Sequence, residues 1–180
     1  MCLSISFCGA HTMGQGIIEV LQKYNQQFIV VDFNPAVIKK LIDKKIHCMY
    51  GDIGHMEVLE KLNFKQAKII ISTIPELDDN KLLIDKSKNI NKKTDILVTA
   101  NTIDEALELY DEGADYVILP KLISSERIGC YLTQMFTSKK DIEEVRRKEI
   151  IFLERKKEEE IIDRFEPDYL KHLQRKITSG

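Results

Sequence analysis

Six short apolar runs alternate with amphipathic helical patterns along residues 3–136 of this chain, and this alternation limits the fold more than any other feature. Runs such as Phe28–Asp32 and Lys68–Thr73 are apolar almost throughout, as expected for strands with both faces buried. Parallel strands of this kind need crossover connections, which the helical patterns supply. The sequence therefore predicts an α/β fold, a Rossmann-like doubly wound parallel six-stranded sheet of order 3-2-1-4-5-6 with a C-terminal helical extension.

The predicted elements can be placed by residue. Strands are expected at residues 3–8, 28–32, 47–50, 68–73, 95–100 and 116–119. Helices are expected at residues 14–24, 35–42, 55–62, 78–89 and 102–113, and a last one after Ser124 or Ser125 up to residue 136. Asn34 with Pro35 marks one helix start, Thr102 with Glu105 forms a capping box, and Gly113 marks a helix end.

The composition changes after Ser138, which divides the chain into two predicted parts. Residues 1–137 form a Rossmann-type domain, and residues 138–180 form a charged helical extension. Glu-to-Lys and Glu-to-Arg pairs at helical spacing favour a long helix over Asp141–Phe165, which Pro167 ends. Two interpretations stay open for it: a solvated helix lying on the domain, or a helix that packs on a partner subunit.

Composition and charge exclude several classes of protein. The chain is 43% hydrophobic and 31% charged, with a net charge of −2, so it is globular and offers no basic field for nucleic acid. No apolar run is long enough to span a bilayer, and the first residues do not form a secretory signal. Cys2, Cys8, Cys48 and Cys130 lack C-x-x-C spacing. We therefore expect a cytoplasmic protein with reduced thiols, Cys8 and Cys48 in the core, and no metal site.

The stretch C-G-A-H-T-M-G at residues 8–14 has the outline of a phosphate-binding turn between a strand and a helix. Gly9 allows the tight turn, and Gly14 allows the helix to pack close to the sheet. The backbone N–H groups of Thr12, Met13 and Gly14 then face a bound anion from the helix N-terminus.

Asp32 ends the next strand, 23 residues after Gly9, where a carboxylate can accept hydrogen bonds from both ribose hydroxyls. The same charge repels a 2′-phosphate and disfavours NADP. We expect the strand end to be exposed. Asp32→Ala is therefore predicted to cost about 1.5–3 kcal/mol of ligand affinity while stability stays nearly unchanged.

His11 stands where the middle glycine of such a turn is usual. Two hypotheses follow. The imidazole donates a hydrogen bond to a phosphate, which makes binding stronger as the pH falls, or it obstructs a full dinucleotide while a mononucleotide is still accepted. The second hypothesis is favoured.

Five segments in this order resemble the RCK or Trk-N domain: C-G-A-H-T-M-G (8–14), V-V-D-F-N-P (30–35), Y-G-D-I (50–53), I-I-S-T-I-P (70–75) and G-A-D-Y-V-I-L-P (113–120). This family comprises cytosolic nucleotide-binding regulators of potassium channels, Trk/Ktr uptake systems and Kef-type antiporters. The segment V-T-A-N-T-I-D-E-A-L-E-L-Y (98–110) is most similar to the antiporter branch.

The resemblance implies a set of nucleotide-binding residues. Gly9–Gly14 would hold the phosphates, and Asp32 with Phe33 the adenosine ribose. Asp52 and Ile53 would contact adenine, and Thr73 with Ile74 would line the far side of the crevice. Asn101 replaces an arginine that many members carry. The implied ligand is AMP, ADP or NAD(H).

Nothing in the sequence marks a catalytic constellation. The residues after Ser138 are too few for a substrate domain, and His47, His55 and His172 have no carboxylate neighbours that form a triad. We therefore expect a regulatory module, not an enzyme, that binds an adenine nucleotide and gates an ion channel or transporter subunit as a homodimer or larger homo-oligomer. Two alternatives stay open, an NAD-dependent oxidoreductase fragment and a structural subunit with an empty pocket.

Overall fold

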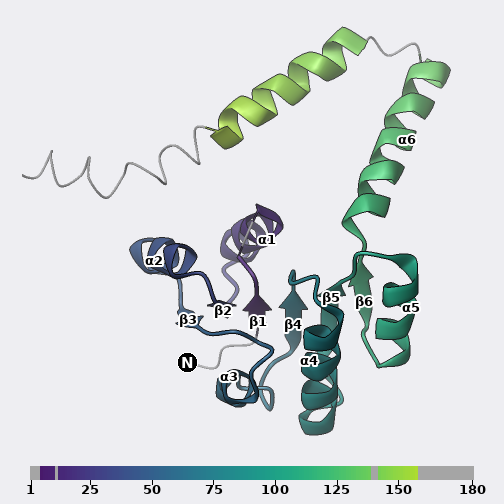
Figure 1. Cartoon of the computed structure of the whole chain (residues 1–180). Helices are drawn as coiled ribbons and strands as arrows, with labels where there is room; N and C mark the ends of the chain where they lie inside the picture. Colours follow the sequence, from purple (N-terminus) through teal and green to yellow (C-terminus); the bar gives the residue numbers. More distant parts are fainter. Residues whose placement is uncertain (1–4, 11, 139–141, 158–180) are drawn as a thin grey trace, which may run out of the picture. The chain divides into compact units, whose positions relative to one another are not determined.

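The computed structural model describes residues 5–10, 12–138 and 142–157, and the side chains of Thr12 and Ser138 are not described. Its centre is a parallel sheet of order β3-β2-β1-β4-β5-β6, which confirms the predicted topology (Figure 1). The strands are β1 (Ile5–Cys8), β2 (Phe28–Asp32), β3 (Cys48–Tyr50), β4 (Ile69–Ser72), β5 (Asp95–Thr99) and β6 (Tyr116–Ile118). Strand β1 lies between β2 and β4, so the chain changes direction across the sheet at this point.

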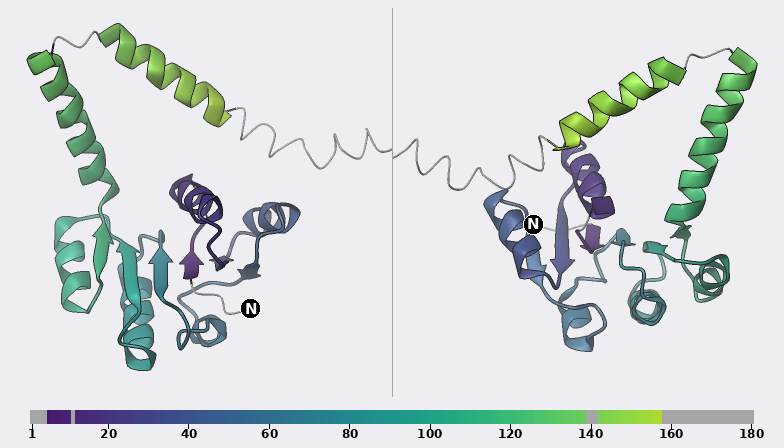
Figure 2. Two further views of the ribbon diagram at one scale, coloured as in Figure 1. Left: turned by 180° about the vertical axis from the view of Figure 1, so that it is seen from behind. Right: turned by 45° about the horizontal axis from the view of Figure 1, so that its top comes forward.

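The connecting helices follow the predicted positions closely. They are α1 (Thr12–Lys23), α2 (Pro35–Asp43), α3 (Met56–Lys61), α4 (Leu77–Ile90), α5 (Ile103–Asp111) and α6 (Pro120–Ser138). Helices α1 and α2 cover one face of the sheet, and α3, α4 and α5 cover the other (Figures 1 and 2).

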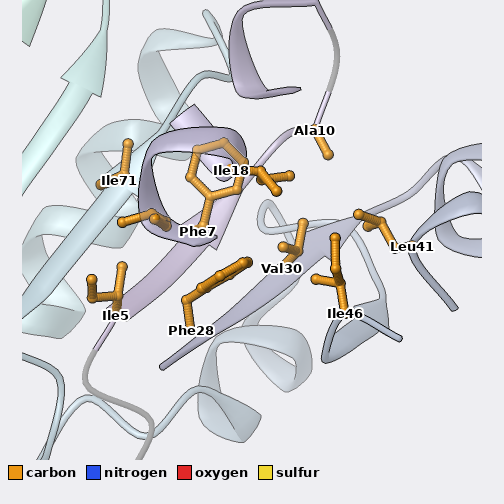
Figure 3. Close-up of a cluster of buried hydrophobic side chains, with 10 residues drawn as sticks. Ile5, Phe7, Ala10, Ile18, Phe28, Val30, Leu41, Ile46 and Ile71 are labelled. Atoms are coloured by element: carbon orange, nitrogen blue, oxygen red, sulfur yellow. The ribbon is translucent and has the colours of Figure 1, made fainter. Parts of the chain in front are cut away.

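The core is built from alternate residues of each strand. Phe7 and Val30, both fully buried, point toward α1 and α2, where Ile18 and Leu41 pack against them (Figure 3). The intervening residues point to the opposite face, so that Cys8 and Val31 pack with Leu83 of α4. This two-sided burial is the physical reason why the strands read as continuous apolar runs.

Local signals in the sequence end and begin these helices as expected. Asn34 caps α2, in which Pro35 is the first residue, and its side chain accepts the Ala36 N–H. At the start of α5, the Thr102 hydroxyl accepts the Glu105 N–H at 3.2 Å. Gly113 adopts a φ of +108°, a left-handed conformation that favours glycine after a helix.

Helix α6 begins earlier than the sequence predicts. The expected cap was Ser124 or Ser125, but the helix starts at Pro120, and the Ser124 hydroxyl donates to the Pro120 carbonyl at 2.8 Å. Proline is compatible with a first helical position because the backbone N–H that it lacks would have no intrahelical partner there in any case.

The chain divides into two compact units after Ser124. In the second unit, residues 142–157 are helical, in agreement with the predicted charged helix, and residues 141 and 158–165 of that prediction lie outside the described residues. The domain boundary after residue 137 stays a prediction. In the described parts of the chain, no helix combines the length and the apolar character needed to cross a bilayer.

Candidate functional site

The predicted site residues follow β1, β2, β3, β4 and β5, whose carboxyl ends lie on one edge of the parallel sheet. Crevices at this edge, where the strand order reverses, are the usual ligand position in such folds. The fold thus brings the loops after β1, β2 and β4 together. His11 lies outside the described residues, as does the side chain of Thr12.

The turn after β1 is held in one orientation by its neighbours. Gly9 has a φ of +85°, and its N–H donates to the Val31 carbonyl at 2.9 Å. The Gly9 carbonyl accepts the Thr73 hydroxyl at 2.6 Å, and the next N–H, that of Ala10, donates to Asp32 Oδ2 at 2.8 Å. The polar groups at the start of this loop are therefore already paired within the protein.

Gly14 brings the start of α1 into contact with this turn. A Cβ added at Gly14 would lie 2.2 Å from the Gly9 carbonyl oxygen and 3.0 Å from the Phe7 ring. Only glycine permits this approach, so the predicted close packing at Gly14 is observed, while its part in binding a phosphate stays a prediction. The first turn of α1 contains no acidic residue, and the N–H groups of Thr12, Met13 and Gly14 belong to this helix start.

Asp32 is more buried than the sequence suggests. It is only 5% exposed, and besides the Ala10 bond its Oδ1 accepts the Asn34 N–H at 2.8 Å. The expectation of an exposed strand end is therefore wrong, because the loops after β1 and β2 both close over this carboxylate, and the expectation of nearly unchanged stability in Asp32→Ala loses its basis. Each carboxylate oxygen of Asp32 keeps a second lone pair that can accept a hydrogen bond from a ribose hydroxyl. Because the residue is almost buried, such a ribose has to approach the small part of the carboxylate that remains exposed.

The segment after β3 contains two residues that were predicted to contact adenine, and the structure places them in different environments. Asp52 is exposed and accepts the Gly54 N–H at 2.9 Å, and its Oδ2 lies 3.7 Å from His55 Nδ1. The Ile53 side chain is completely buried in the core beneath α3 and α4. Because the whole residue is 0% exposed, neither the side chain nor the backbone of Ile53 presents accessible surface to adenine in this conformation.

Carboxylates gather beside this segment at the start of α4. A Cβ at Gly54 would lie 2.7 Å from Asp79 Oδ1 and 3.4 Å from Asp52 Oδ1. Burial raises the pKa of Asp79, and the charges of Asp52, Glu76 and Asp78 raise it further. In the described ranges of the chain, no group of three or more His, Cys, Asp or Glu side chains is arranged to hold a metal ion.

Two exposed aromatic side chains stand at the ends of neighbouring strands. Phe33 follows Asp32 and is 61% exposed, and Tyr50, paired in register with Asp32, is 63% exposed. Phe33 was predicted as a ribose neighbour, whereas sequence reasoning missed Tyr50. The signal was available, because Tyr50 is the last strand residue before the Gly51-Asp52 turn.

The loops after β4 and β5 are tied together by amide side chains. The Asn101 side chain donates to the Pro75 carbonyl at 3.1 Å, and its N–H donates to Glu105. Ile74 is half-buried, with its N–H donating to the Ser72 hydroxyl at 3.3 Å. Asn101 is thus engaged in the loop structure rather than held free for a phosphate.

Asn80, which the sequence analysis did not single out, holds the loops after β4 and β5 together. It is fully buried and donates to the Ile74 carbonyl at 2.8 Å and the Thr99 carbonyl at 3.0 Å, while its Oδ1 has no partner. An asparagine in the first turn of a helix resembles a solvent-facing residue, so its buried role could not be recognised from the sequence.

Cys8 completes the site as an inert group. It precedes Gly9, is fully buried as predicted, and has a pKa raised to about 12 by burial and by the charge of Asp32. A thiol in this state is not a nucleophile at neutral pH. Cys48 was expected in the core but is only half-buried, with its thiol near the Ile38 carbonyl at 3.9 Å.

Comparison with known proteins identifies a family for this fold. The family profile of the TrkA-N domain matches residues 5–120. Probable potassium channel protein 2 of Methanocaldococcus jannaschii is 31% identical over 125 residues, which are 68% of this chain and 36% of that protein. Potassium channel protein 1 of the same organism is 24% identical over 124 residues, 68% of this chain and 37% of that protein. The chain therefore spans little more than a third of these relatives.

Solved structures share the fold at lower identity. The TrkA-N domain of the inner membrane protein ybaL from Escherichia coli has a TM-score of 0.69 at 18% identity, covering 73% of this chain and 98% of that one. The Kef CTD of Shewanella denitrificans in its AMP-bound form has a TM-score of 0.63 at 16% identity, covering 84% and 91%. The GsuK channel bound to NAD has a TM-score of 0.56 at 23% identity, covering 67% and 22%.

The TrkA-N match begins at the first residue of β1 and ends at the first residue of α6, so it takes in the whole sheet and every loop of the candidate site. The resemblance seen in the sequence is confirmed, and the chain belongs to the TrkA-N, or RCK/Trk-N, domain family.

Proposed function

We propose that this chain is a regulatory module that binds an adenine nucleotide and, through it, controls a potassium channel, a potassium uptake system or a Kef-type cation/proton antiporter at the cytosolic face of a membrane. Family membership supports the regulatory role, and the named relatives are potassium channel proteins. One observation carries the nucleotide site: the N-terminus of α1 is brought against the Gly9 turn by Gly14 and carries no acidic residue in its first turn.

In this proposal the phosphate lies at the start of α1, facing the N–H groups of Thr12, Met13 and Gly14. The ribose lies over the exposed edge of Asp32 beside Phe33. The adenine lies toward Tyr50 and Asp52, since an exposed aromatic side chain offers a surface on which a base can stack.

We further propose that a mononucleotide such as AMP is preferred to NAD(H). Helix α4 has Asp78 and Asp79 in its first turn, and α5 has Asp104 and Glu105. Negative charge at these helix starts opposes the second phosphate of a dinucleotide that extends across the crevice. NADP is disfavoured as well, because its 2′-phosphate would meet the Asp32 carboxylate.

The proposal is for binding and not for catalysis. The Cys8 thiol beside the loop is held protonated, and the Thr73 hydroxyl is already donated to the Gly9 carbonyl. Neither group is prepared as a nucleophile.

Assembly as a homodimer or a larger homo-oligomer is part of the proposal. Helix α6 exposes Ile128, Leu132 and Phe136 at successive helical turns. Such a stripe favours burial against another helix in an assembly.

The ligand is tested by calorimetric titration of the whole chain with AMP, ADP, NADH and NADPH, with thermal unfolding followed in parallel. We expect AMP and ADP to bind and to raise the melting temperature, NADH to bind more weakly, and NADPH to bind least. Absence of both heat and thermal shift at millimolar ligand would remove the basis of the proposal.

His11→Gly separates the two hypotheses for the middle of the loop. If His11 obstructs a dinucleotide, the variant gains NADH affinity at every pH. If His11 donates to a phosphate, wild-type affinity rises as the pH falls from about 8 to about 6, and the variant loses this dependence. Weaker NADH binding by the variant would contradict the obstruction hypothesis.

A further inference from the structure

The peptide group between Gly9 and Ala10 is held at both of its ends by side chains from other strands. Its carbonyl oxygen accepts the hydroxyl of Thr73, which follows β4, at 2.6 Å. Its N–H donates at 2.8 Å to Asp32 Oδ2 at the end of β2. In a trans peptide these two groups point in opposite directions, so the two bonds together define one orientation of the peptide plane.

Rotation of this peptide would reverse both contacts. The carbonyl oxygen would then face the Asp32 carboxylate, which is repulsive. The N–H would face the Thr73 hydroxyl oxygen, which can accept it only if the hydroxyl proton turns from the Gly9 carbonyl at 2.6 Å to the more distant Cys8 carbonyl at 3.3 Å. The rotation changes ψ of Gly9 and φ of Ala10, and only the glycine turns without steric cost. The two flanking side chains and the Ala10 backbone therefore favour the observed orientation together.

The same carbonyl oxygen is also the atom on which α1 packs. A Cβ at Gly14 would lie 2.2 Å from it, so the position of the Gly9 carbonyl sets how closely the helix start can approach the turn. Thr73 also lies close to Gly9, since a Cβ at Gly9 would lie 2.7 Å from the Thr73 hydroxyl oxygen. The Gly9 backbone is thus in close contact with both the Thr73 hydroxyl and the start of α1.

We propose that Thr73 is a positioning residue, whose hydroxyl acts with Asp32 to fix the orientation of the Gly9–Ala10 peptide and thereby sets the start of α1 for a phosphate. The predicted consequence for nucleotide binding rests on the proposed function, but the two hydrogen bonds that orient the Gly9–Ala10 peptide exist without a ligand. Because the hydroxyl proton is donated to Gly9, Thr73 acts through the loop and not as a donor to the nucleotide.

Thr73→Val tests the proposal, with Thr73→Ser as the variant that restores the hydroxyl and Thr73→Ala as a second variant that cannot crowd the loop. The matched control is Thr99→Val, because the Thr99 hydroxyl donates to the Ser72 carbonyl at 2.9 Å from the neighbouring strand and does not touch Gly9. Hydrogen exchange of the Ala10 amide is measured without ligand, and AMP affinity is measured by calorimetry.

Loss of one hydrogen bond is expected to speed Ala10 exchange by about tenfold and to weaken AMP binding by about tenfold in Thr73→Val and Thr73→Ala. Thr73→Ser should stay close to wild type in both measurements. Thr99→Val should lower the melting temperature without either effect.

The proposal is overturned if Ala10 exchange is unchanged in Thr73→Val, or if Thr99→Val speeds it equally. If wild type binds AMP and Thr73→Val binds it with the same affinity, Thr73 has no role in positioning while the proposed function stands. If wild type binds no nucleotide, the proposed function fails, and the exchange measurement still decides whether Thr73 holds the Gly9–Ala10 peptide in its orientation.

Discussion

The two ends of the parallel sheet are held together by different kinds of interaction. At the amino end, opposite charges and backbone groups pair with one another. At the carboxyl end, glycine contacts, a buried carboxylate and a group of like charges meet around the candidate site. The same strands pass through both ends, so the difference arises from the connecting segments.

Polar and charged groups at the amino ends of β5 and β6 pair with one another. Lys88 Nζ donates to the Thr94 carbonyl at 3.0 Å and to Asp115 Oδ2 at 2.7 Å, and the same Asp115 oxygen accepts the Ile96 N–H at 2.8 Å. The Thr94 hydroxyl donates to the Ala67 carbonyl at 2.9 Å. These bonds fix β4, β5 and β6 to their connections.

The carboxyl end contains features that cost stability in the free protein. Asp79 lies among other carboxylates that, together with burial, raise its pKa, and two aromatic side chains, Phe33 and Tyr50, are mostly exposed. Perturbed charges of this kind concentrate where ligands bind. We therefore expect changes at the carboxyl end to alter stability and binding together, and changes at the amino end to alter stability alone.

The largest effect is expected for Gly14→Ala. The added methyl group would overlap the Gly9 carbonyl, a backbone atom that cannot move away cheaply, so we expect a loss of about 3 kcal/mol of unfolding free energy together with AMP affinity. Gly16→Ala is the control, because nothing lies within 4 Å of its added Cβ on the same helix. The control should be neutral or more stable by about 0.5–1 kcal/mol. Equal effects in urea unfolding would contradict the close packing of α1 on the turn.

Asp32→Ala is expected to rank second. It leaves the Ala10 and Asn34 N–H groups without their acceptor in a buried position, at a cost of about 2–3 kcal/mol in stability. Nucleotide affinity should fall as well. Denaturant unfolding and titration of the same sample measure both quantities, and unchanged stability would show that the carboxylate does not hold the two loops.

Lys88→Met examines the amino end. Removing the ammonium group breaks its bonds to Asp115 and Thr94, and we expect a loss of about 1–2 kcal/mol in stability with no change in AMP affinity. Lys92→Met, at an exposed position in the same connection, should change neither. A reduced AMP affinity in Lys88→Met would remove the distinction between the two ends.

The smallest effect is a difference in the sign of pH dependence. The pKa of Asp79 is raised, so its ionised form destabilises the fold at neutral pH and the penalty is relieved as the pH falls through that raised pKa. Burial acts to raise the pKa of Asp115, but bonds from Lys88 and the Ile96 N–H hold it below its usual value. Its contribution is therefore present above the unfolded pKa and is lost as the pH falls through the folded one.

Unfolding free energies of Asp79→Asn and Asp115→Asn, measured from about pH 7 to about pH 3, check these signs. Asp79→Asn should be more stable than wild type at neutral pH, by roughly 0.5 kcal/mol or less, and lose this advantage toward pH 4. Asp115→Asn should be less stable at neutral pH and approach wild type at the acid end. The same sign for both variants would contradict the assignment.

The order of the six strands could be predicted because it depends on local periodicity, on caps such as Asn34 and Thr102, and on the handedness of crossovers. Asp32 could be named as a site residue because it ends a strand, and Thr73 because the family resemblance implied it. Their bonds to the Gly9–Ala10 peptide could not be predicted, because they join residues 22 and 64 positions apart. Those contacts depend on how three loops close over one another, and no local pattern encodes this.

Two further residues show where sequence reasoning fails. Ile53 follows Gly51 and Asp52 in a segment that resembles a ligand contact, yet the turn directs its side chain into the core. Asn80 is polar and occurs in an acidic helix start, yet it lies fully buried beneath two loops. Burial set by tertiary packing overrides residue type in both cases.

The most direct test of the account is an amide proton–nitrogen NMR titration of the whole chain with AMP. We predict that the amide signals of Ala10, Met13, Gly14 and Asn34 shift progressively and saturate, while those of Thr94, Ile96 and Asp115 at the opposite end do not move. Unchanged signals at Ala10, Met13 and Gly14 at millimolar AMP, or shifts confined to the amino end of the sheet, would contradict it.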